Sequence, residues 1–181
     1  VTIDAQANAD GSLDVTEART FDFSGDFTAV WWTFDNMPTK ESMLSVKSVS
    51  LINESTGETQ TLSPVEFQRA WREAGGAGYP SYSIDEDENT VYVFFDETDS
   101  EVTMTLSYSI SNFVQVYDDV AEVYWQYIGH GWAVDSDHVT TTLTVPVAAG
   151  AQVRAGDNVR AWGHGPLDGS LSIGDDGTIY A

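Results

Sequence analysis

Residues 102–110 read Val-Thr-Met-Thr-Leu-Ser-Tyr-Ser-Ile, and this stretch alternates strictly between apolar and small polar side chains. Every even position is apolar or aromatic, and every odd position is Thr or Ser. Successive side chains of a β-strand point to opposite faces, so the pattern is typical of an antiparallel strand with one dry and one wet face. The stretch therefore predicts a sheet that is buried on one side.

The same period of two recurs along most of the chain. Residues 139–145 alternate in this way, and the alternating runs 1–7 and 13–23 flank an Asp10-Gly11 turn. An Asp-Gly pair between two such runs is a strong hairpin signal. Further strands are predicted over residues 27–34, 44–52, 91–95, 171–173 and 178–180.

One short helix is predicted over residues 64–74. Ser63 is a good N-cap, Pro64 suits the first helical position, and Glu66 completes a capping box. Apolar residues up to Trp71 then line one face. About eight short strands with a single helix indicate an all-β fold, an antiparallel β-sandwich of the immunoglobulin-like kind.

Residues 117–129 fit two structures. Val123 and Tyr127 belong to a set of apolar residues at helical spacing, and they also fit a strand face that includes Trp125. Because β-branched and aromatic residues dominate the segment, we prefer a strand and leave a helix open.

The length suits one sizeable domain, and the clearest seam follows Pro146, where Ala-Ala-Gly interrupts the pattern. We expect a sandwich domain over residues 1–146 and short strands docked on it over residues 147–181. The second segment is too small for a core of its own, because chains below about 40 residues usually need disulfides or metals.

The chain contains no cysteine, which excludes disulfides, cysteine-ligated metal sites and a cysteine nucleophile. No apolar run approaches the roughly 20 residues of a membrane-spanning helix. The first residues also lack the basic and apolar regions of a signal peptide. Export and membrane anchoring, where they occur, are therefore expected to use segments outside this sequence.

The charge balance limits the partners of the chain. There are 29 Asp and Glu residues against 7 Lys and Arg residues, which gives a formal net charge of −22. Such a field repels phosphate backbones and anionic lipid headgroups. We therefore expect neither nucleic-acid binding nor direct binding to a membrane surface, while cationic partners stay open.

Several stretches, in the same order, resemble domain-of-unknown-function family 2207, a family of predicted bacterial membrane proteins. They are residues 8–17 (Asn-Ala-Asp-Gly-Ser-Leu-Asp-Val-Thr-Glu), residues 108–125, Gly129, Trp132 and the strand that ends at Val145-Pro146. The resemblance implies an export signal, this β-rich region outside the cytoplasm, and transmembrane helices after it. It also implies at least one more strand beyond Tyr180, so that the segment 147–181 is truncated, and it implies no activity for any residue.

The sequence offers little evidence for a metal site. His130, His138 and His164 show no metal-ligand spacing, and we expect solvated polar residues. Residues 85–89 place carboxylates at alternate positions, but Thr90 stands where a calcium loop needs Gly. A solvated acidic turn is the expectation, with no metal and no cofactor.

Two carboxylates fall in otherwise apolar surroundings. Glu17 lies on the apolar face of its predicted strand, where either a β-bulge turns it outward or Arg19 neutralises it. Glu122 is interpreted as structural, paired with an arginine such as Arg19, rather than as a general acid. The sequence contains no nucleophile elbow, P-loop or dinucleotide fingerprint, so we expect no catalytic residue and no enzyme.

Two adjacent tryptophans provide the candidate ligand-binding residue. The even face of the predicted strand 27–34 is the more apolar, so Trp32 is expected in the core and Trp31 outside. An outward indole can stack on a sugar ring or on a side chain of a partner. The alternative is that Trp31 is covered by a loop or by the helix that carries Trp71.

Together these observations favour a non-catalytic interaction or sensing domain outside the cytoplasm. It would be anchored to the cell membrane through segments absent from this sequence, with an unknown protein or glycan as its partner. The alternative is a carbohydrate-binding module or a glycan hydrolase, because β-sandwiches host both. A linear row of exposed Trp and Tyr would favour sugar binding, and two facing carboxylates in a cleft would favour hydrolysis.

Overall fold

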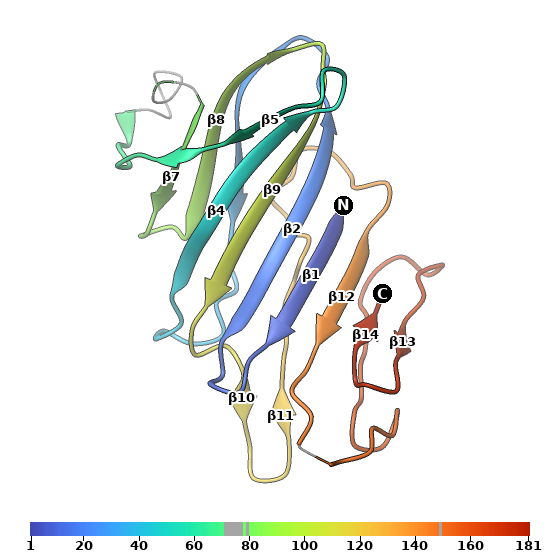
Figure 1. Cartoon of the computed structure of the whole chain (residues 1–181). Helices are drawn as coiled ribbons and strands as arrows, with labels where there is room; N and C mark the ends of the chain where they lie inside the picture. The colour runs from blue at the N-terminus through green and yellow to red at the C-terminus, as the bar shows by residue number, and fades with distance from the viewer. Residues whose placement is uncertain (71–77, 79, 149) are drawn as a thin grey trace.

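The computed structural model describes residues 1–70, 78, 80–148 and 150–181, and it is built from β-strands arranged in two layers (Figure 1). This confirms the all-β expectation. The strands of the larger sheet are β1 (Thr2–Ala7), β2 (Leu13–Asp22), β4 (Leu44–Asn53), β5 (Glu58–Thr61), β9 (Glu101–Ile110), β12 (Thr140–Thr144), β13 (Ser172–Ile173) and β14 (Ile179–Tyr180).

The larger sheet has the order β13-β14-β12-β1-β2-β9-β4-β5. Its neighbours pair antiparallel except for β1 and β12, which run parallel. The smaller sheet has the order β3-β8-β7-β6, and its β6 and β7 also run parallel. The sheets are therefore mixed, where the alternation predicted antiparallel pairing throughout. The smaller sheet consists of β3 (Asp26–Thr33), β6 (Ser63–Pro64), β7 (Ser81–Asp85) and β8 (Thr90–Thr98).

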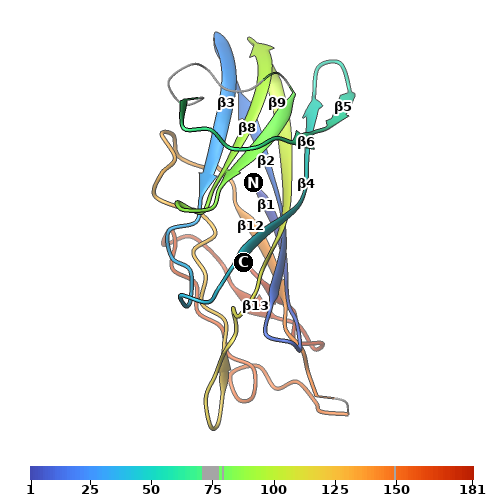
Figure 2. The same cartoon turned by 90° about the vertical axis from the view of Figure 1, so that its left-hand side faces the viewer.

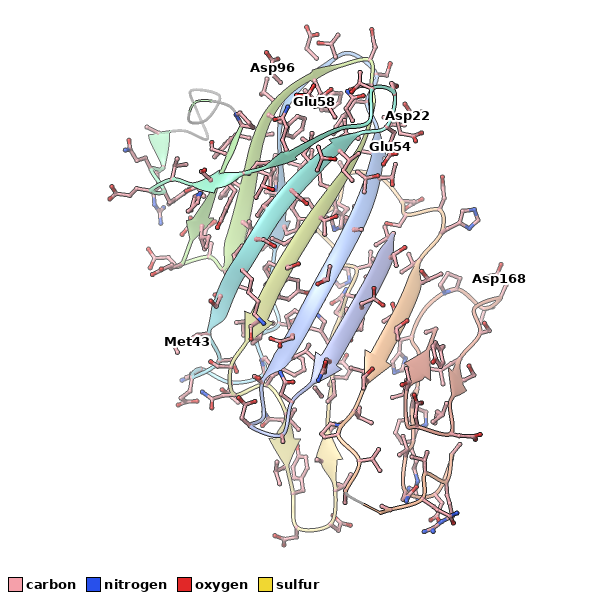
Figure 3. All side chains as sticks on the ribbon, in the orientation of Figure 1. Asp22, Met43, Glu54, Glu58, Asp96 and Asp168 are labelled. Atoms are coloured by element: carbon pink, nitrogen blue, oxygen red, sulfur yellow. The ribbon has the colours of Figure 1, made fainter. Side chains whose placement is uncertain are left out.

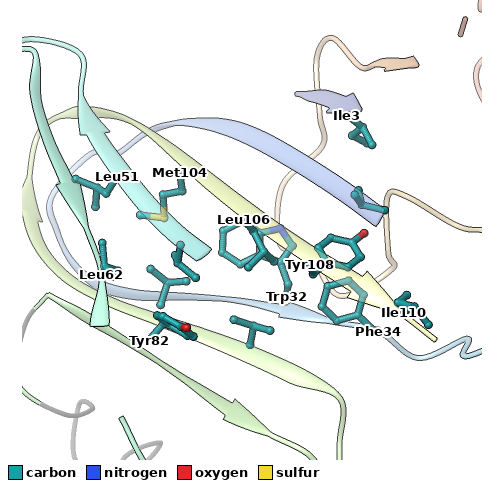
Figure 4. Packing of buried hydrophobic residues seen from close by; sticks show 14 of the residues in the cluster. Ile3, Trp32, Phe34, Leu51, Leu62, Tyr82, Met104, Leu106, Tyr108 and Ile110 are labelled. Carbon is teal, nitrogen blue, oxygen red and sulfur yellow. The ribbon is translucent and has the colours of Figure 1, made fainter. Parts of the chain in front are cut away.

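The core lies between the two layers, which Figure 2 shows from the side. The even residues of β9, from Val102 to Ile110, are 0–1% exposed, as their alternation predicts. They pack against inward residues of the smaller sheet, and the ring of Phe34 lies 4.9 Å from that of Tyr108, centre to centre (Figure 4). One cluster with members from both sheets confirms the sandwich.

The hairpin of β1 and β2 forms where the Asp-Gly signal predicts it. The amide of Asn8 donates to the carbonyl of Ser12 over 2.8 Å, which closes the loop. Gly11 takes a φ of 85°, in the left-handed region that a residue without a Cβ adopts freely. The register then places Glu17 opposite Ile3 on β1 and Leu106 on β9.

The start of the predicted helix is wrong. Ser63 and Pro64 form β6 beside β7, and residues 65–68 have no regular secondary structure. The amide of Leu62 donates to the carbonyl of Val49, and the Leu62 side chain enters the core. The later part of the prediction, with Trp71, lies outside the described residues.

Residues 117–129 form neither a long strand nor a helix. The short strands β10 (Gln115–Val116) and β11 (Ala121–Glu122) form a hairpin, and residues 123–129 continue without a strand ladder. The side chains of this continuation still alternate, because Trp125 and Tyr127 pack on the core while Tyr124 is exposed. The segment lies beside the end of β3, where the side-chain amide nitrogen of Asn36 donates to the side-chain oxygen of Gln126 over 3.1 Å.

The C-terminal strands belong to the larger sheet. β14 pairs with β12, and β13 forms the outer edge beyond it. The division of the chain at residue 146 stays a prediction, because strand pairing does not measure whether the two parts unfold together.

We expect the seam near Ala148 to resist limited proteolysis, and deletion of residues 147–181 to lower the Tm. The reason is that β14 pairs with β12 in the larger sheet, so deletion leaves β12 as an unpaired edge. Rapid cleavage near Ala148 that leaves the remaining domain with an unchanged Tm would contradict this prediction.

Candidate functional site

Trp31 lies on the outer face of the smaller sheet. Its side chain is 53% exposed, whereas the neighbouring Trp32 is 4% exposed and belongs to the core. Adjacent residues of a strand point to opposite faces, so β3 places the two indoles on opposite sides of the sheet. The predicted orientation of both residues is confirmed, and a ligand-binding role for Trp31 stays a prediction.

Other aromatic rings extend the Trp31 surface across the smaller sheet. The ring centre of Tyr92 on β8 lies 6.3 Å from that of Trp31, and Phe67 stacks on Tyr92 at 5.5 Å. Tyr92 and its neighbour Phe94 are buried, so Trp31 is the exposed end of a covered aromatic cluster. Among the residues that the structure describes, this arrangement gives one exposed stacking surface on this face rather than a row of them.

A buried ion pair lies on the opposite, inner face of the sandwich. Glu17 and Arg19 both point inward from β2, and the Nε of Arg19 donates to Oε1 of Glu17. The indole nitrogen of Trp32 donates to the same oxygen over 3.0 Å. β2 pairs with both of its neighbours without a bulge at Glu17, so neutralisation by Arg19 is the prediction that is confirmed.

The guanidinium of Arg19 has two further contacts in the segment that runs beside β3. Its Cζ lies 4.2 Å from the ring centre of Trp132, and an Nη donates to the carbonyl of Tyr127 over 3.4 Å. Trp132 in turn packs edge-on against Trp32, with ring centres 5.3 Å apart. A cation over an indole face is an attractive arrangement, so the pair is enclosed by aromatic rings that favour the positive charge.

Burial changes the protonation behaviour of this cluster. It raises the pKa of the Glu17 carboxyl, while the charge of Arg19 and the hydrogen bonds from Arg19 and Trp32 oppose that rise. Burial also raises the pKa of the Tyr127 phenol, whose hydroxyl is buried without a hydrogen-bond partner in the described part of the chain. The Glu17 carboxylate is thus held by donors and not aimed at an open cleft.

A small cavity adjoins the ion pair. Its volume is about 30 Å³, and its lining includes Glu17, Arg19 and Tyr127, with Asn36 and His130 on the outer side. A water needs about 10–15 Å³ of such space, so the cavity suits water and not a sugar ring. The two carboxylates of a glycosidase need a cleft that admits the glycosidic bond between them, which this space does not provide.

The acidic turn at residues 85–89 is partly buried, which corrects one expectation. Glu86, Asp87 and Glu88 are exposed as predicted, but Asp85 is buried. Its carboxylate accepts hydrogen bonds from the backbone amides of Asp87 and Glu88. Asp85 therefore stabilises the turn between β7 and β8, and within the described ranges no three acidic or histidine side chains gather as a metal site would require.

We expect millimolar calcium to leave the Tm of metal-free protein unchanged. The carboxylate of Asp85 already accepts two backbone amides, and a site filled at about 100 times its Kd would add about 2.7 kcal/mol of stability. A rise of several degrees with calcium, absent with magnesium at the same ionic strength, would contradict this interpretation.

The remaining titratable candidates are solvated. His130, His138 and His164 are all exposed, which confirms the expectation for them. Glu122 is exposed on β11, so its predicted pairing with Arg19 is wrong, and Arg19 pairs with Glu17 instead. The net negative charge is displayed at the surface, and Figure 3 labels four exposed acids around the end of the sandwich far from β10 and β11: Asp22, Glu54, Glu58 and Asp96.

The hairpin of β10 and β11 is a surface that sequence reasoning missed. It extends beyond the end of the sandwich (Figures 1 and 2) and exposes Val116, Tyr117, Val120 and Tyr124. The signal was present, because paired apolar residues flank an acidic Asp118-Asp119 turn, but the preference for one strand through residues 117–129 concealed it.

Comparison with known families gives a match over the whole sequence. A family model described as "Predicted membrane protein (DUF2207) N-terminal domain" matches residues 1–181. Among curated proteins nothing matches the chain. In the described parts of the chain, no helix has the length and apolar character needed to cross a membrane.

Proposed function

This chain belongs to the DUF2207 family of predicted membrane proteins, as its N-terminal domain, and on that premise we propose that it is a non-catalytic interaction domain displayed outside the cytoplasm. Its partner is a protein or a glycan, bound through the outer face of the smaller sheet. The parent protein anchors it to the membrane through other segments.

The single observation that carries the interaction role is the position of Trp31. More than half of this indole is exposed, while Tyr92, the ring beside it, is buried. A large ring that is held by packed neighbours loses little conformational freedom on binding, which is why Trp is enriched among the residues that dominate interface energies. Trp31 lies on β3, the outer strand of its sheet, whose end is flanked by the segment that carries Gln126, so a partner can approach the indole from above the sheet.

The buried charges support a non-catalytic role. An acid that acts in catalysis must reach a substrate, and Glu17 is instead enclosed by Arg19, Trp32 and the adjoining cavity of about 30 Å³. The pair is well suited to hold β2, β3 and the segment that carries Trp132 in one arrangement.

A location outside the cytoplasm is tested by labelling a single cysteine. Ser55 lies in the exposed turn between β4 and β5, and the domain contains no cysteine of its own. In the parent protein, we expect Ser55→Cys to react with a membrane-impermeant maleimide in intact cells. The unsubstituted protein is the control, and labelling that requires permeabilised cells would place the domain in the cytoplasm.

The partner is tested by photo-crosslinking in the parent protein. We expect a photoreactive residue at Trp31 to give one discrete crosslinked product, and the same residue at Trp162 to give none, although Trp162 is 77% exposed. If the crosslinked product is a polysaccharide, the domain is a carbohydrate-binding module. Equal crosslinking at both positions would show that Trp31 is not a specific contact, and release of reducing sugars from cell-wall polysaccharide would show an enzyme.

A further inference from the structure

The hairpin Gln115–Glu122 is firmly held at its base. The amides of Phe113 and Val114 donate to the carbonyl of Gly11 over 2.8 and 2.9 Å. Phe113 is buried and packs edge-on against Trp125, with ring centres 5.3 Å apart. Two-stranded hairpins are marginally stable alone in water, so the order of this one depends on the anchored base.

The tip is a tight turn. Gln115 pairs with Glu122 and Val116 with Ala121, and beyond them the amide of Tyr117 donates to the carbonyl of Val120 over 2.8 Å. Asp118 and Asp119 therefore form a two-residue loop at the far end.

Both faces of the hairpin carry exposed apolar side chains. On the face that continues from the core, Val114 and Val123 pack on the sandwich, and Val116 extends the same face past its end. On the opposite face Tyr117 lies across from Val120, and the polar pair of Gln115 and Glu122 separates them from Tyr124. Val116 is 78% exposed and Tyr124 69%. Exposed apolar side chains on both faces of a projecting element are typical of an element that is buried in an interface.

The charge of the tip indicates what covers it. Asp118 and Asp119 enter any interface first, and buried carboxylates need positive partners there. An anionic membrane repels the tip and the net charge of −22. A second copy of the chain offers only 7 Lys and Arg residues against 29 Asp and Glu residues, so it supplies little positive charge.

We propose that the hairpin Gln115–Glu122, with Tyr124, inserts into a groove of a partner protein that has aliphatic or aromatic walls and Lys or Arg at its closed end. The proposal rests on the proposed function, because it assumes a binding partner, but it uses a surface separate from Trp31. The two can therefore fail independently.

Photo-crosslinking in the full-length protein tests the insertion. A photoreactive residue at Val120 is expected to give one protein product in the native cells, and the matched control at Val134, which is 71% exposed, is expected to give none. The crosslinked peptide is expected to carry Lys or Arg among apolar residues. The Trp31 probe in the same cells separates the two proposals. A crosslinked product at Trp31 without one at Val120 would contradict the insertion of the hairpin and leave the proposed role of Trp31 intact.

Charge reversal tests the chemistry of the groove. Asp118→Lys/Asp119→Lys is expected to lower the crosslink yield at Val120 roughly tenfold or more, as removal of a charge pair from an interface does. Asp22→Lys/Asp96→Lys makes the same change in net charge at the other end of the sandwich (Figure 3) and is expected to leave the yield unchanged. Equal losses in the two variants would overturn the proposal, since they would reflect net charge.

Two measurements on the purified domain test whether the hairpin instead binds a second copy of the chain or a membrane. We expect it to sediment as a monomer and not to float with vesicles of either neutral or anionic lipid. Self-association or flotation that disappears in Tyr117→Ser/Val120→Ser would assign the hairpin to a second copy or to a membrane and overturn the proposal. An unchanged Tm in this variant shows that the exposed side chains do not stabilise the fold.

Discussion

Truncation of Trp32 to alanine is expected to lower the free energy of unfolding by about 3–5 kcal/mol, as truncations of buried aromatic residues do. Trp32 fills the space between the sheets, packs on Trp132 and donates to the carboxylate of Glu17. The loss combines a cavity in the core with a hydrogen bond removed from a buried charge, and the second effect alone is destabilising.

Trp31→Ala is the matched control, because the same side chain is removed one residue away. Its indole is more than half exposed and packs beside Tyr92, so we expect a loss of less than about 1 kcal/mol. Urea denaturation of both variants with equal m-values measures the difference. Equal large losses would show that the outer face is covered as thoroughly as the inner one and would remove Trp31 as a ligand platform.

The half-buried strands could be predicted because their two faces differ in chemistry. In β9 the buried residues are apolar, from Val102 to Ile110, and the other face carries Thr and Ser. In β7 the sequence Ser81-Tyr82-Ser83-Ile84-Asp85 alternates as well, yet Ser81, Ser83 and Asp85 are also buried. The sequence did not predict this short strand, because its polar residues on both faces follow the predicted helix without the contrast between faces that marks β9.

The predicted start of the helix is wrong because local signals competed with a tertiary one. A helix N-cap contributes about 1 kcal/mol, whereas burial of a leucine side chain contributes about 1.5–3 kcal/mol. Leu62 enters the core directly before Ser63, and the strand pairing of Ser63 with Ser81 uses the backbone that the helix start would need. Sequence cannot show β7 in advance as the neighbour of Ser63.

Among the candidate site residues, contacts within one strand could be predicted from the sequence, whereas contacts made by the tertiary fold could not. Glu17 and Arg19 lie two residues apart on one strand, so their shared face follows from the period of two, and the ion pair could be anticipated. Trp132 could not, because only the fold brings residues 123–132 beside β3. Glu122 was misplaced for the same reason, since its apolar neighbours face solvent on a projecting hairpin.

Replacement of Arg19 by methionine is expected to destabilise the domain by about 3–5 kcal/mol, the range for breaking a buried ion pair by removing one partner. Glu17 would stay buried, with Trp32 as a donor but no counter-charge. The double variant Glu17→Gln/Arg19→Met removes both charges, and buried pairs replaced together are often neutral or stabilising. We therefore expect the double variant to recover most of the loss.

The stability deficit of Arg19→Met relative to the double variant is expected to depend on pH in a defined direction. Burial raises the pKa of Glu17 in the folded state above its value of about 4.3 in the unfolded chain, and removal of Arg19 takes away the charge that opposes this rise. Between the two values the folded state binds more protons, so stability falls as pH increases. The deficit of Arg19→Met relative to the double variant is thus smallest below about pH 4.3 and grows as pH rises through the folded pKa. Urea denaturation across this range measures the deficit, the other acids being common to both variants. A deficit that stayed constant with pH would show that Glu17 is not the group left uncompensated, and that Arg19 stabilises the fold through its packing on Trp132 instead.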